Sequence, residues 1–213
     1  MIKLGSLFTG IGAWEKALKD MTIEYDLQFF GEIDKYAIKS YCQIHNETED
    51  KNIGDITTVD ADTVPDIDML VYSPPCQAFS VAGKMMGVED KRGVLFFDAL
   101  RVIETKQPKI AIMENVKGLT TKKFKETFES MLEELERVGY KNYWKVLNLK
   151  NYGLPQNRER VFIVSIRNDI DKGFEFPEGY DNGLRLKDML EDEVDEKYYI
   201  SQEKVEKLLA QTL

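Results

Sequence analysis

The fold is decided by the stretch IDMLVYSPPCQ at residues 67–77. Its first half, Ile67–Tyr72, is an apolar run of the length and composition typical of a buried strand. Pro74 and Pro75 then end the strand and stiffen the turn, because proline has a fixed φ and lacks the N–H that a ladder needs. Cys76 is therefore held at a strand exit, where α/β folds bind their ligands. That position suits a nucleophile, although a free cysteine is more often a small buried residue in a turn.

The length and composition describe an ordinary globular domain. With 213 residues, the chain can bury a substantial core in one domain. No apolar stretch approaches the length of a membrane span, and the strand pattern that follows Met1 directly predicts that there is no signal peptide. Two cysteines fit a reducing cytosol rather than a disulfide framework, so we expect a cytoplasmic protein. A single histidine, His45, argues against a zinc site or a histidine-based triad, and we expect no metal.

The net charge of −9 is unevenly distributed. Residues 168–213 hold 13 acidic and 6 basic side chains, a net of −7, which leaves −2 for the rest of the chain. An acidic chain binds nucleic acid poorly, because contacts to phosphate supply most of the affinity. If DNA is a partner, positive charge must be concentrated locally or be supplied by another molecule.

The order of strand, glycine turn and helix at the start of the chain indicates a nucleotide-binding α/β unit. We expect a strand at Lys3–Phe8, a turn that contains Gly10 and Gly12, and a helix at Trp14–Lys19. Glycines let the backbone approach a ligand closely, and a helix N-terminus favours negative charge. The third glycine of the dinucleotide fingerprint is missing, so the turn taken alone is equally typical of an ordinary tight turn.

A second strand at Leu27–Phe30 is followed by Glu32, which lies 20 residues beyond the second glycine of the turn. In nucleotide-binding folds an acidic residue at this spacing binds ribose hydroxyls, whereas the alternative is a solvated glutamate. Asp34 then caps a helix that runs to about His45. On that helix we expect Cys42 in the core and His45 at the surface.

The rest of the chain alternates further strands and helices. We expect strands three to seven at Asn52–Ile56, Ile67–Tyr72, Lys109–Met113, Tyr143–Asn148 and Val161–Ile166, and helices at Arg92–Lys106, across Phe124–Val138 and near Ser201–Gln211. This pattern predicts an α/β fold with an open, mostly parallel, seven-stranded Rossmann-like sheet whose last strand is antiparallel.

Three further features point to a ligand site. The glycine-studded loop Ala78–Lys91 follows Cys76 closely and has the length of a mobile lid, or of an ordinary surface loop. Glu114 stands at the end of the fifth strand, and the ends of parallel strands share one edge of a sheet. Arg158 and Arg160 alternate along an extended segment and so share one face, which fits a site as well as it fits a surface salt-bridge ladder.

In their order and spacing, these segments resemble the motifs of the cytosine-C5 DNA methyltransferase family over nearly the whole chain. The segments that carry the resemblance are FTGIG at 8–12, PCQ at 75–77, ENV at 114–116 and QNRER at 156–160, with EID at 32–34, GDI at 54–56 and RGVLFF at 92–97 in agreement. The resemblance implies the Rossmann-like fold of S-adenosylmethionine-dependent methyltransferases, with S-adenosylmethionine as the methyl donor.

By this resemblance, ten residues would bind the methyl donor. Glu32 would take the ribose hydroxyls, Ile33 and Ile56 would pack on adenine, and Asp55 would accept a hydrogen bond from the adenine amino group. The other residues would line the methionine and ribose region or complete the wall: Phe8, Gly10, Ile11, Gly12, Pro74 and Leu95.

The resemblance also implies the catalytic groups. C5 of cytosine is a poor nucleophile until a thiolate adds at C6, and Cys76 would be that thiolate. Glu114 would donate to N3, while Arg158 and Arg160 would hold the ring oxygen and the nearby backbone and favour the thiolate. The base would have to be flipped out of the duplex under the predicted lid. Further residues would contact substrate or belong to the lid: Gln77, Ser80, Arg92, Asn115 and Gln156.

The sequence departs from the family pattern in two places. Ala13 replaces the second glycine of a pair in the cofactor loop. Beyond that, we find no candidate for the target-recognition region or for the returning segment that finishes the cofactor pocket. We therefore expect a catalytic domain at residues 1–168, and we expect residues 169–213 to be an acidic lead-in to a missing recognition region.

Several readings of the function stay open at this point. The favoured reading is the catalytic half of a DNA cytosine-C5 methyltransferase of prokaryotic or phage type, as in restriction–modification, acting on double-stranded DNA. A second polypeptide would then supply recognition, or the chain is a cut or reduced form. The alternatives are a tRNA cytosine-C5 methyltransferase and a non-catalytic cofactor-binding or regulatory subunit.

Overall fold

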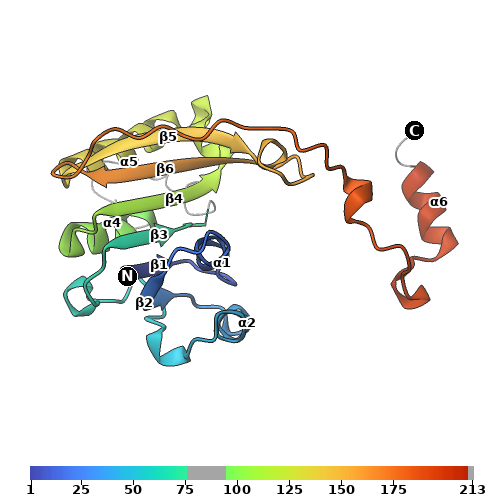
Figure 1. Cartoon of the computed structure of the whole chain (residues 1–213), viewed down its shortest axis with the longest axis horizontal. Coiled ribbons are helices and arrows are strands. Elements are labelled where there is room, and N and C mark those ends of the chain that lie inside the picture. The colour runs from blue at the N-terminus through green and yellow to red at the C-terminus, as the bar shows by residue number, and fades with distance from the viewer. Residues whose placement is uncertain (76–94, 211–213) are drawn as a thin grey trace. The chain divides into compact units, whose positions relative to one another are not determined.

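The computed structural model describes residues 1–75 and 95–210, which form two compact units. The larger unit comprises Met1–Asn148 and Arg158–Glu178, and it holds the sheet and its helices (Figure 1). The smaller unit comprises Leu149–Asn157 and Gly179–Leu213.

The larger unit is built on one sheet of mostly parallel strands. The strands are β1 (Ile2–Leu7), β2 (Tyr25–Gly31), β3 (Met69–Tyr72), β4 (Ile110–Val116), β5 (Tyr140–Asn148) and β6 (Glu159–Arg167). Their order is β2-β1-β3-β4-β6-β5. Neighbours from β2 to β4 pair in parallel, whereas β6 is antiparallel to both β4 and β5. The predicted Rossmann-like sheet with an antiparallel last strand is thus confirmed.

The strand expected at Asn52–Ile56 is not formed, so the described sheet has six strands rather than seven. Only Asn52 makes an isolated parallel bridge, with Phe30. The Asn52 side chain instead binds the backbone of Glu32, with Oδ1 accepting from the N–H at 3.1 Å and Nδ2 donating to the carbonyl at 3.0 Å. A side chain that takes up backbone groups competes with a ladder, and the segment becomes a loop beside the end of β2.

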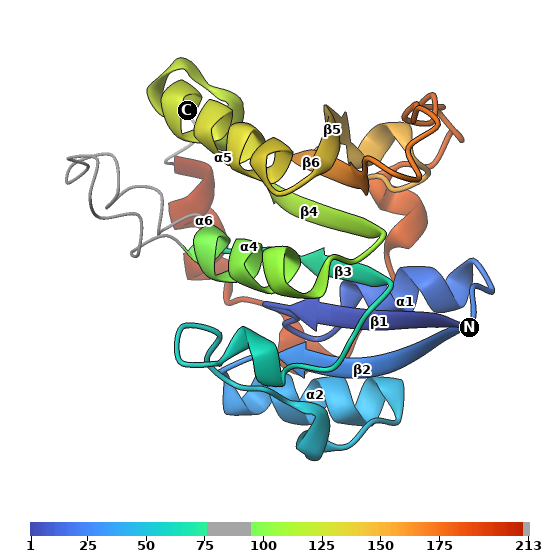
Figure 2. The same ribbon diagram turned by 90° about the vertical axis from the view of Figure 1, so that its left-hand side faces the viewer.

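Helices cover both faces of the sheet (Figures 1 and 2). They are α1 (Ala13–Asp20), α2 (Lys35–His45), α4 (Leu95–Lys106) and α5 (Lys125–Arg137). In the larger core cluster, Phe96 of α4 and Met131 of α5 pack with Leu70 of β3. In the second cluster, Tyr41 of α2 packs with Phe30 of β2. Burial on both faces explains why β3 and the first four residues of β4 are continuous apolar runs.

The helix α2 confirms one prediction and overturns another. Asp34 caps it, because Oδ1 accepts from the backbone N–H groups of Tyr36 and Ala37 at 2.9 and 2.8 Å. His45, which the sequence predicts at the surface, is only 5% exposed. The prediction was wrong because the last turn of α2 lies against the glycine turn that follows β1. Cys42 is partly buried against the second cluster.

Asp68 ties the beginnings of three strands together. It lies just before β3, and Oδ2 accepts from the backbone N–H of Lys3 at 3.0 Å while Oδ1 pairs with Lys109 Nζ at 2.9 Å. These two donors lower the pKa of the Asp68 carboxyl. Replacing Asp68 with alanine is expected to reduce the free energy of unfolding at pH 7 by about 1 kcal/mol, as urea titration measures it.

The pH dependence of that loss follows from the direction of the pKa shift. A carboxyl with a lowered folded-state pKa stabilises the fold above its unfolded pKa, so the difference between parent and variant should shrink as the pH falls below about 4. Asp66→Ala is the matched control, since Asp66 is exposed and lies 3.8 Å from Lys106. Equal losses in the two variants would contradict the assignment.

The smaller unit consists mainly of short turns and one helix. Its elements are η6 (Leu149–Asn151), η7 (Leu186–Met189), η8 (Glu196–Tyr198) and α6 (Gln202–Ala210). A single bridge pairs Tyr152 with Tyr180. The predicted C-terminal helix is confirmed. Among the residues that the structure describes, no helix has both the length and the apolar composition of a membrane span.

Candidate active site

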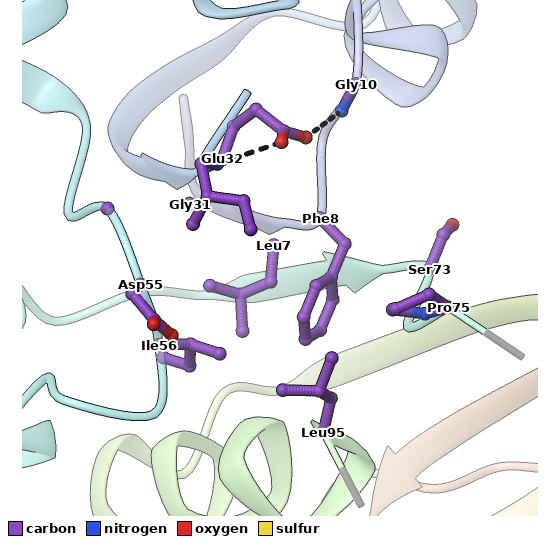
Figure 3. A pocket seen from close by; sticks show the side chains of 12 residues that line it. Leu7, Phe8, Gly10, Gly31, Glu32, Asp55, Ile56, Ser73, Pro75 and Leu95 are labelled. Carbon is purple, nitrogen blue, oxygen red and sulfur yellow. Dashed lines mark hydrogen bonds between the residues drawn. The ribbon is translucent and has the colours of Figure 1, made fainter. Parts of the chain in front are cut away.

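A cavity of about 330 Å³ opens at the carboxyl ends of β1, β2 and β3 (Figure 3). Parallel strands bring these ends to one edge of the sheet, which is the edge where open α/β sheets bind ligands. The lining residues are Leu7, Phe8, Gly10, Gly31, Glu32, Ile33, Gly54, Asp55, Ile56, Ser73, Pro75 and Leu95. Seven of the ten residues expected to bind a cofactor are therefore brought together here.

Glu32 is the most strongly held polar group of the cavity. Its Oε2 accepts from the Gly10 N–H at 2.8 Å, and its Oε1 accepts from the N–H groups of Ile33 and Asp34 at 2.8 and 3.0 Å (Figure 3). The Asn52 amide fixes the backbone of the same residue. The carboxylate is thus aimed at the glycine turn before any ligand arrives.

The wall of the cavity is largely apolar. Phe8, at φ 56° just past β1, is held by its N–H, which donates to the Gly31 carbonyl at 2.8 Å. Its ring points toward Leu95 in Figure 3. Ile56 is buried, whereas Ile33 is 73% exposed and lies at the mouth. Asp55 is exposed, and its Oδ1 accepts from the Thr57 N–H and hydroxyl.

Three residues expected in the cavity lie outside its lining. Ile11 is 58% exposed, and Gly12 is buried beneath the turn. Pro74 is also buried, while its neighbour Pro75 takes the place in the wall. Beside it, the Ser73 hydroxyl accepts from the Trp14 indole N–H at 3.2 Å.

A carboxylate and a guanidinium pair at the adjoining strands β4 and β6. Glu114 Oε1 lies 2.9 Å from Arg160 Nε, and the two side chains are 24% and 18% exposed. Arg160 Nη1 also donates to the Glu159 carbonyl at 2.8 Å. Arg158 is exposed just before β6, and its N–H donates to Asn148 Oδ1 at 3.2 Å. Two of the expected catalytic groups are therefore in direct contact.

Asn115 braces the turn that precedes the expected nucleophile. Its side chain is buried, and Nδ2 donates to the Pro74 carbonyl at 2.8 Å while Oδ1 accepts from the Val116 N–H at 2.9 Å. This contact links the end of β4 to the end of β3. Sequence patterns give no hint of such a bracing role for Asn115 or for Asn52, because both depend on partners far along the chain.

The remaining expected site residues divide between two regions. Gln156 belongs to the smaller unit, where it is exposed and its N–H donates to the Leu154 carbonyl at 2.8 Å. Cys76, Gln77, Ser80 and Arg92 lie outside the described residues, as does the predicted lid Ala78–Lys91. Within residues 1–75 and 95–210, no three His, Cys, Asp or Glu side chains gather in a way that could hold a metal ion.

Comparisons with known proteins identify relatives of the chain. The family model for C-5 cytosine-specific DNA methylases matches residues 2–212. The chain is 42% identical to the orphan methyltransferase M.Rho11sI of Bacillus phage rho11s, with 99% of this chain and 48% of that protein covered. It is 41% identical to the type II methyltransferase M.NgoBI of Neisseria gonorrhoeae, with 99% and 65% covered.

The fold has a solved counterpart in the Dnmt2 methyltransferase of S. pombe. The TM-score is 0.77 at 25% identity, and the match covers 99% of this chain and 67% of that chain. The chain spans 48% of the length of the phage relative and 65% of the length of the Neisseria relative.

Proposed function

The chain belongs to the family of C-5 cytosine-specific DNA methylases, and we propose that it carries the catalytic part of an enzyme that methylates C5 of cytosine in duplex DNA. The observation that carries the proposal is the placement of the Glu32 cavity and the Glu114–Arg160 pair along one edge of the sheet, where β1 to β4 end and the antiparallel β6 begins. Since the relatives come from bacteria and phages, we place this activity in the bacterial cytoplasm.

The residues of the cavity fit S-adenosylmethionine. A carboxylate has about four acceptor positions, and Glu32 uses three of them on backbone N–H groups. One position on Oε2 is left for a ribose hydroxyl. Ile33 and Ile56 offer apolar surface for a flat base, and Asp55 offers an acceptor for its amino group. When bound, S-adenosylmethionine supplies the methyl group as an electrophile.

Cys76 is the group that adds to cytosine and is later released from it. The thiolate Sγ forms a bond to C6, and the electron pair moves through the ring so that C5 becomes the nucleophile. C5 takes the methyl group, its proton leaves to a base, and the C6–Sγ bond breaks to restore the aromatic ring and the thiolate. Asn115 serves this step indirectly, because its bond holds the Pro74 carbonyl two residues before Cys76 in the sequence.

Glu114 and Arg160 handle the charge that develops on the ring. Arg160 stabilises the Glu114 carboxylate while the two are paired at 2.9 Å. When the ring oxygen of cytosine draws the guanidinium away, the Glu114 carboxyl is released to act as the general acid toward N3. The Arg158 guanidinium then contacts the DNA backbone beside the flipped base.

Covalent trapping tests the proposal directly. Duplex DNA that contains 5-fluorocytosine cannot lose fluorine as it would lose the C5 proton, so the adduct should accumulate in the presence of S-adenosylmethionine. The chain is incubated alone and together with the product of the adjacent reading frame, because a second polypeptide could carry target recognition. An adduct seen by denaturing electrophoresis with the parent chain, and absent with Cys76→Ser, is the expected result.

Two outcomes would contradict the proposal. No adduct under either condition would favour a non-catalytic cofactor-binding role. Transfer of a labelled methyl group to tRNA but not to duplex DNA would move the substrate to RNA.

Positive charge at the edge of the sheet that carries the candidate site supports DNA as the partner. Residues 117–125, which follow β4, carry four lysines and no acidic residue in a chain of net charge −9. Lys117 pairs with Glu159 at 2.8 Å, whereas Lys122 and Lys123 are exposed. A lysine that contacts phosphate releases a counterion, so each of Lys122→Gln and Lys123→Gln should lower the slope of log K against log[salt] by about 1.

The control for this measurement removes one charge at the opposite edge. Lys3 is exposed at the beginning of β1, and Lys3→Gln should leave the salt slope of duplex binding unchanged. Fluorescence anisotropy between low and moderate salt measures all three variants. Equal slopes for all of them would mean that the lysine segment does not touch the DNA.

A further inference from the structure

His45 lies directly beneath the turn that borders the cavity. It is the last residue of α2 and the only histidine of the chain. Its ring packs on Tyr41 with centroids 4.8 Å apart, and the Tyr41 hydroxyl is in turn anchored by donating to Glu15 Oε1 at 2.9 Å. A Cβ built on Gly12 would lie 2.2 Å from His45 Nε2. The imidazole ring therefore packs directly against the glycine turn.

The two ring nitrogens have partners that fix the tautomer. Nδ1 lies 3.4 Å from the Lys19 ammonium, which can only donate, so Nδ1 is the acceptor. Nε2 lies 3.0 Å from the Ile11 carbonyl, which can only accept, so Nε2 carries the hydrogen and donates it. Lys19 also donates to the His45 carbonyl at 3.1 Å. Both ring nitrogens are therefore engaged.

Within the turn, the Gly12 N–H donates to the Thr9 carbonyl at 2.9 Å, and the contacts from Glu32 and His45 act on the residues between them. Gly10 and Gly12 have φ values of 54° and 85°, and glycine confers no side-chain preference for these angles over others. From the cavity side, Glu32 holds the Gly10 N–H. From the opposite side, His45 holds the Ile11 carbonyl. The turn is thus held at two neighbouring residues, by Glu32 just past the end of β2 and by His45 at the end of α2.

We propose that His45 is a positioning residue that holds the cofactor turn in its binding conformation through the Nε2–H bond to Ile11. The inference rests on the proposed function, in which S-adenosylmethionine occupies the cavity. A ligand that takes the remaining acceptor position on Glu32 acts on the cavity side of the turn, whereas His45 lies outside the cavity lining. His45 is therefore the contact that keeps Gly10 and Gly12 in place both before and after binding, which lowers the ordering cost of binding.

The test compares His45→Phe with His45→Gln. Phenylalanine keeps a ring on Tyr41 but cannot donate, whereas glutamine places an amide N–H near the former Nε2. For the phenylalanine variant we expect S-adenosylmethionine to bind about fivefold to tenfold more weakly by calorimetry, the size expected from one lost hydrogen bond. Amide exchange in peptides covering residues 8–13 should be faster without ligand, and both effects should be largely reversed in the glutamine variant.

These measurements separate positioning from general stability. The unfolding temperature of each variant is recorded without ligand, and exchange is compared in a reference peptide from β3, which should not change. If the phenylalanine variant does not fold, His45→Asn replaces it, since its amide is one methylene shorter than that of glutamine and cannot reach the Ile11 carbonyl.

Two results would overturn the proposal: unchanged affinity and turn exchange in the variant that cannot donate, or equal losses in the glutamine variant. Failure of the parent chain to bind S-adenosylmethionine would refute the proposed cofactor instead. In that case the exchange measurements still decide whether His45 holds the turn.

Discussion

Replacing Glu114 with glutamine is expected to lower methyl transfer to cytosine by about a hundredfold to ten-thousandfold, the range that a positioned general acid contributes. Glutamine keeps the size of the side chain and can still donate a hydrogen bond toward N3. It cannot deliver a proton, and it gives up the charged contact with Arg160. Transfer of a labelled methyl group under single-turnover conditions measures the loss, and the affinity for S-adenosylmethionine should stay within about twofold.

Glu159→Gln is the matched control for this experiment. Glu159 carries a carboxylate at the same edge of the sheet, but this carboxylate pairs with Lys117 at 2.8 Å rather than with Arg158 or Arg160. Its side chain is 43% exposed, so its removal should change stability and transfer only slightly. If Glu114→Gln keeps more than about a tenth of the parent rate, or if both variants lose the same amount, Glu114 is not the acid.

Most of the sheet could be predicted because apolar runs, and the residues that end them, can be recognised in the local sequence. The run Met69–Tyr72 is apolar and is followed closely by two prolines, so β3 and its exit are visible without a structure. The segment Asn52–Ile56 shows the limit of this reasoning. Its apolar residues match a short strand, but the Asn52 side chain binds the backbone of Glu32. That preference depends on a residue 20 positions away, which no local pattern contains.

The candidate site was predictable to the extent that spacing fixes it. The number of residues between the glycine turn and Glu32 can be counted in the sequence, and this spacing correctly predicts that the turn and the carboxylate lie together. The direction of the turn depends on positive φ values, and so Ile11 and Gly12 were expected in the wall but lie outside it. For His45 one local signal exists, since it lies four residues after the buried Tyr41 and so shares its helix face.

Replacing Gly12 with alanine is expected to reduce the free energy of unfolding by about 2–4 kcal/mol and to abolish measurable binding of S-adenosylmethionine. About 1 kcal/mol comes from φ 85°, which residues with a Cβ adopt at a cost. The rest comes from overpacking, because the new Cβ would lie 2.2 Å from His45 Nε2 and 2.9 Å from Tyr41 Cδ2. Urea titration without ligand measures the stability term separately from binding.

Gly10→Ala separates the two causes, because Gly10 also has a positive φ, 54°, but a Cβ there meets nothing within 4 Å. Its loss of stability should therefore be about 1 kcal/mol. Adding His45→Ala to Gly12→Ala opens the space that the methyl group needs but leaves φ unchanged. A coupling free energy of about 1–2 kcal/mol between the two substitutions is then expected from a double-mutant cycle. Additive losses would mean that Gly12 is required for its backbone angle alone, and that the ring of His45 can move aside without disturbing the turn.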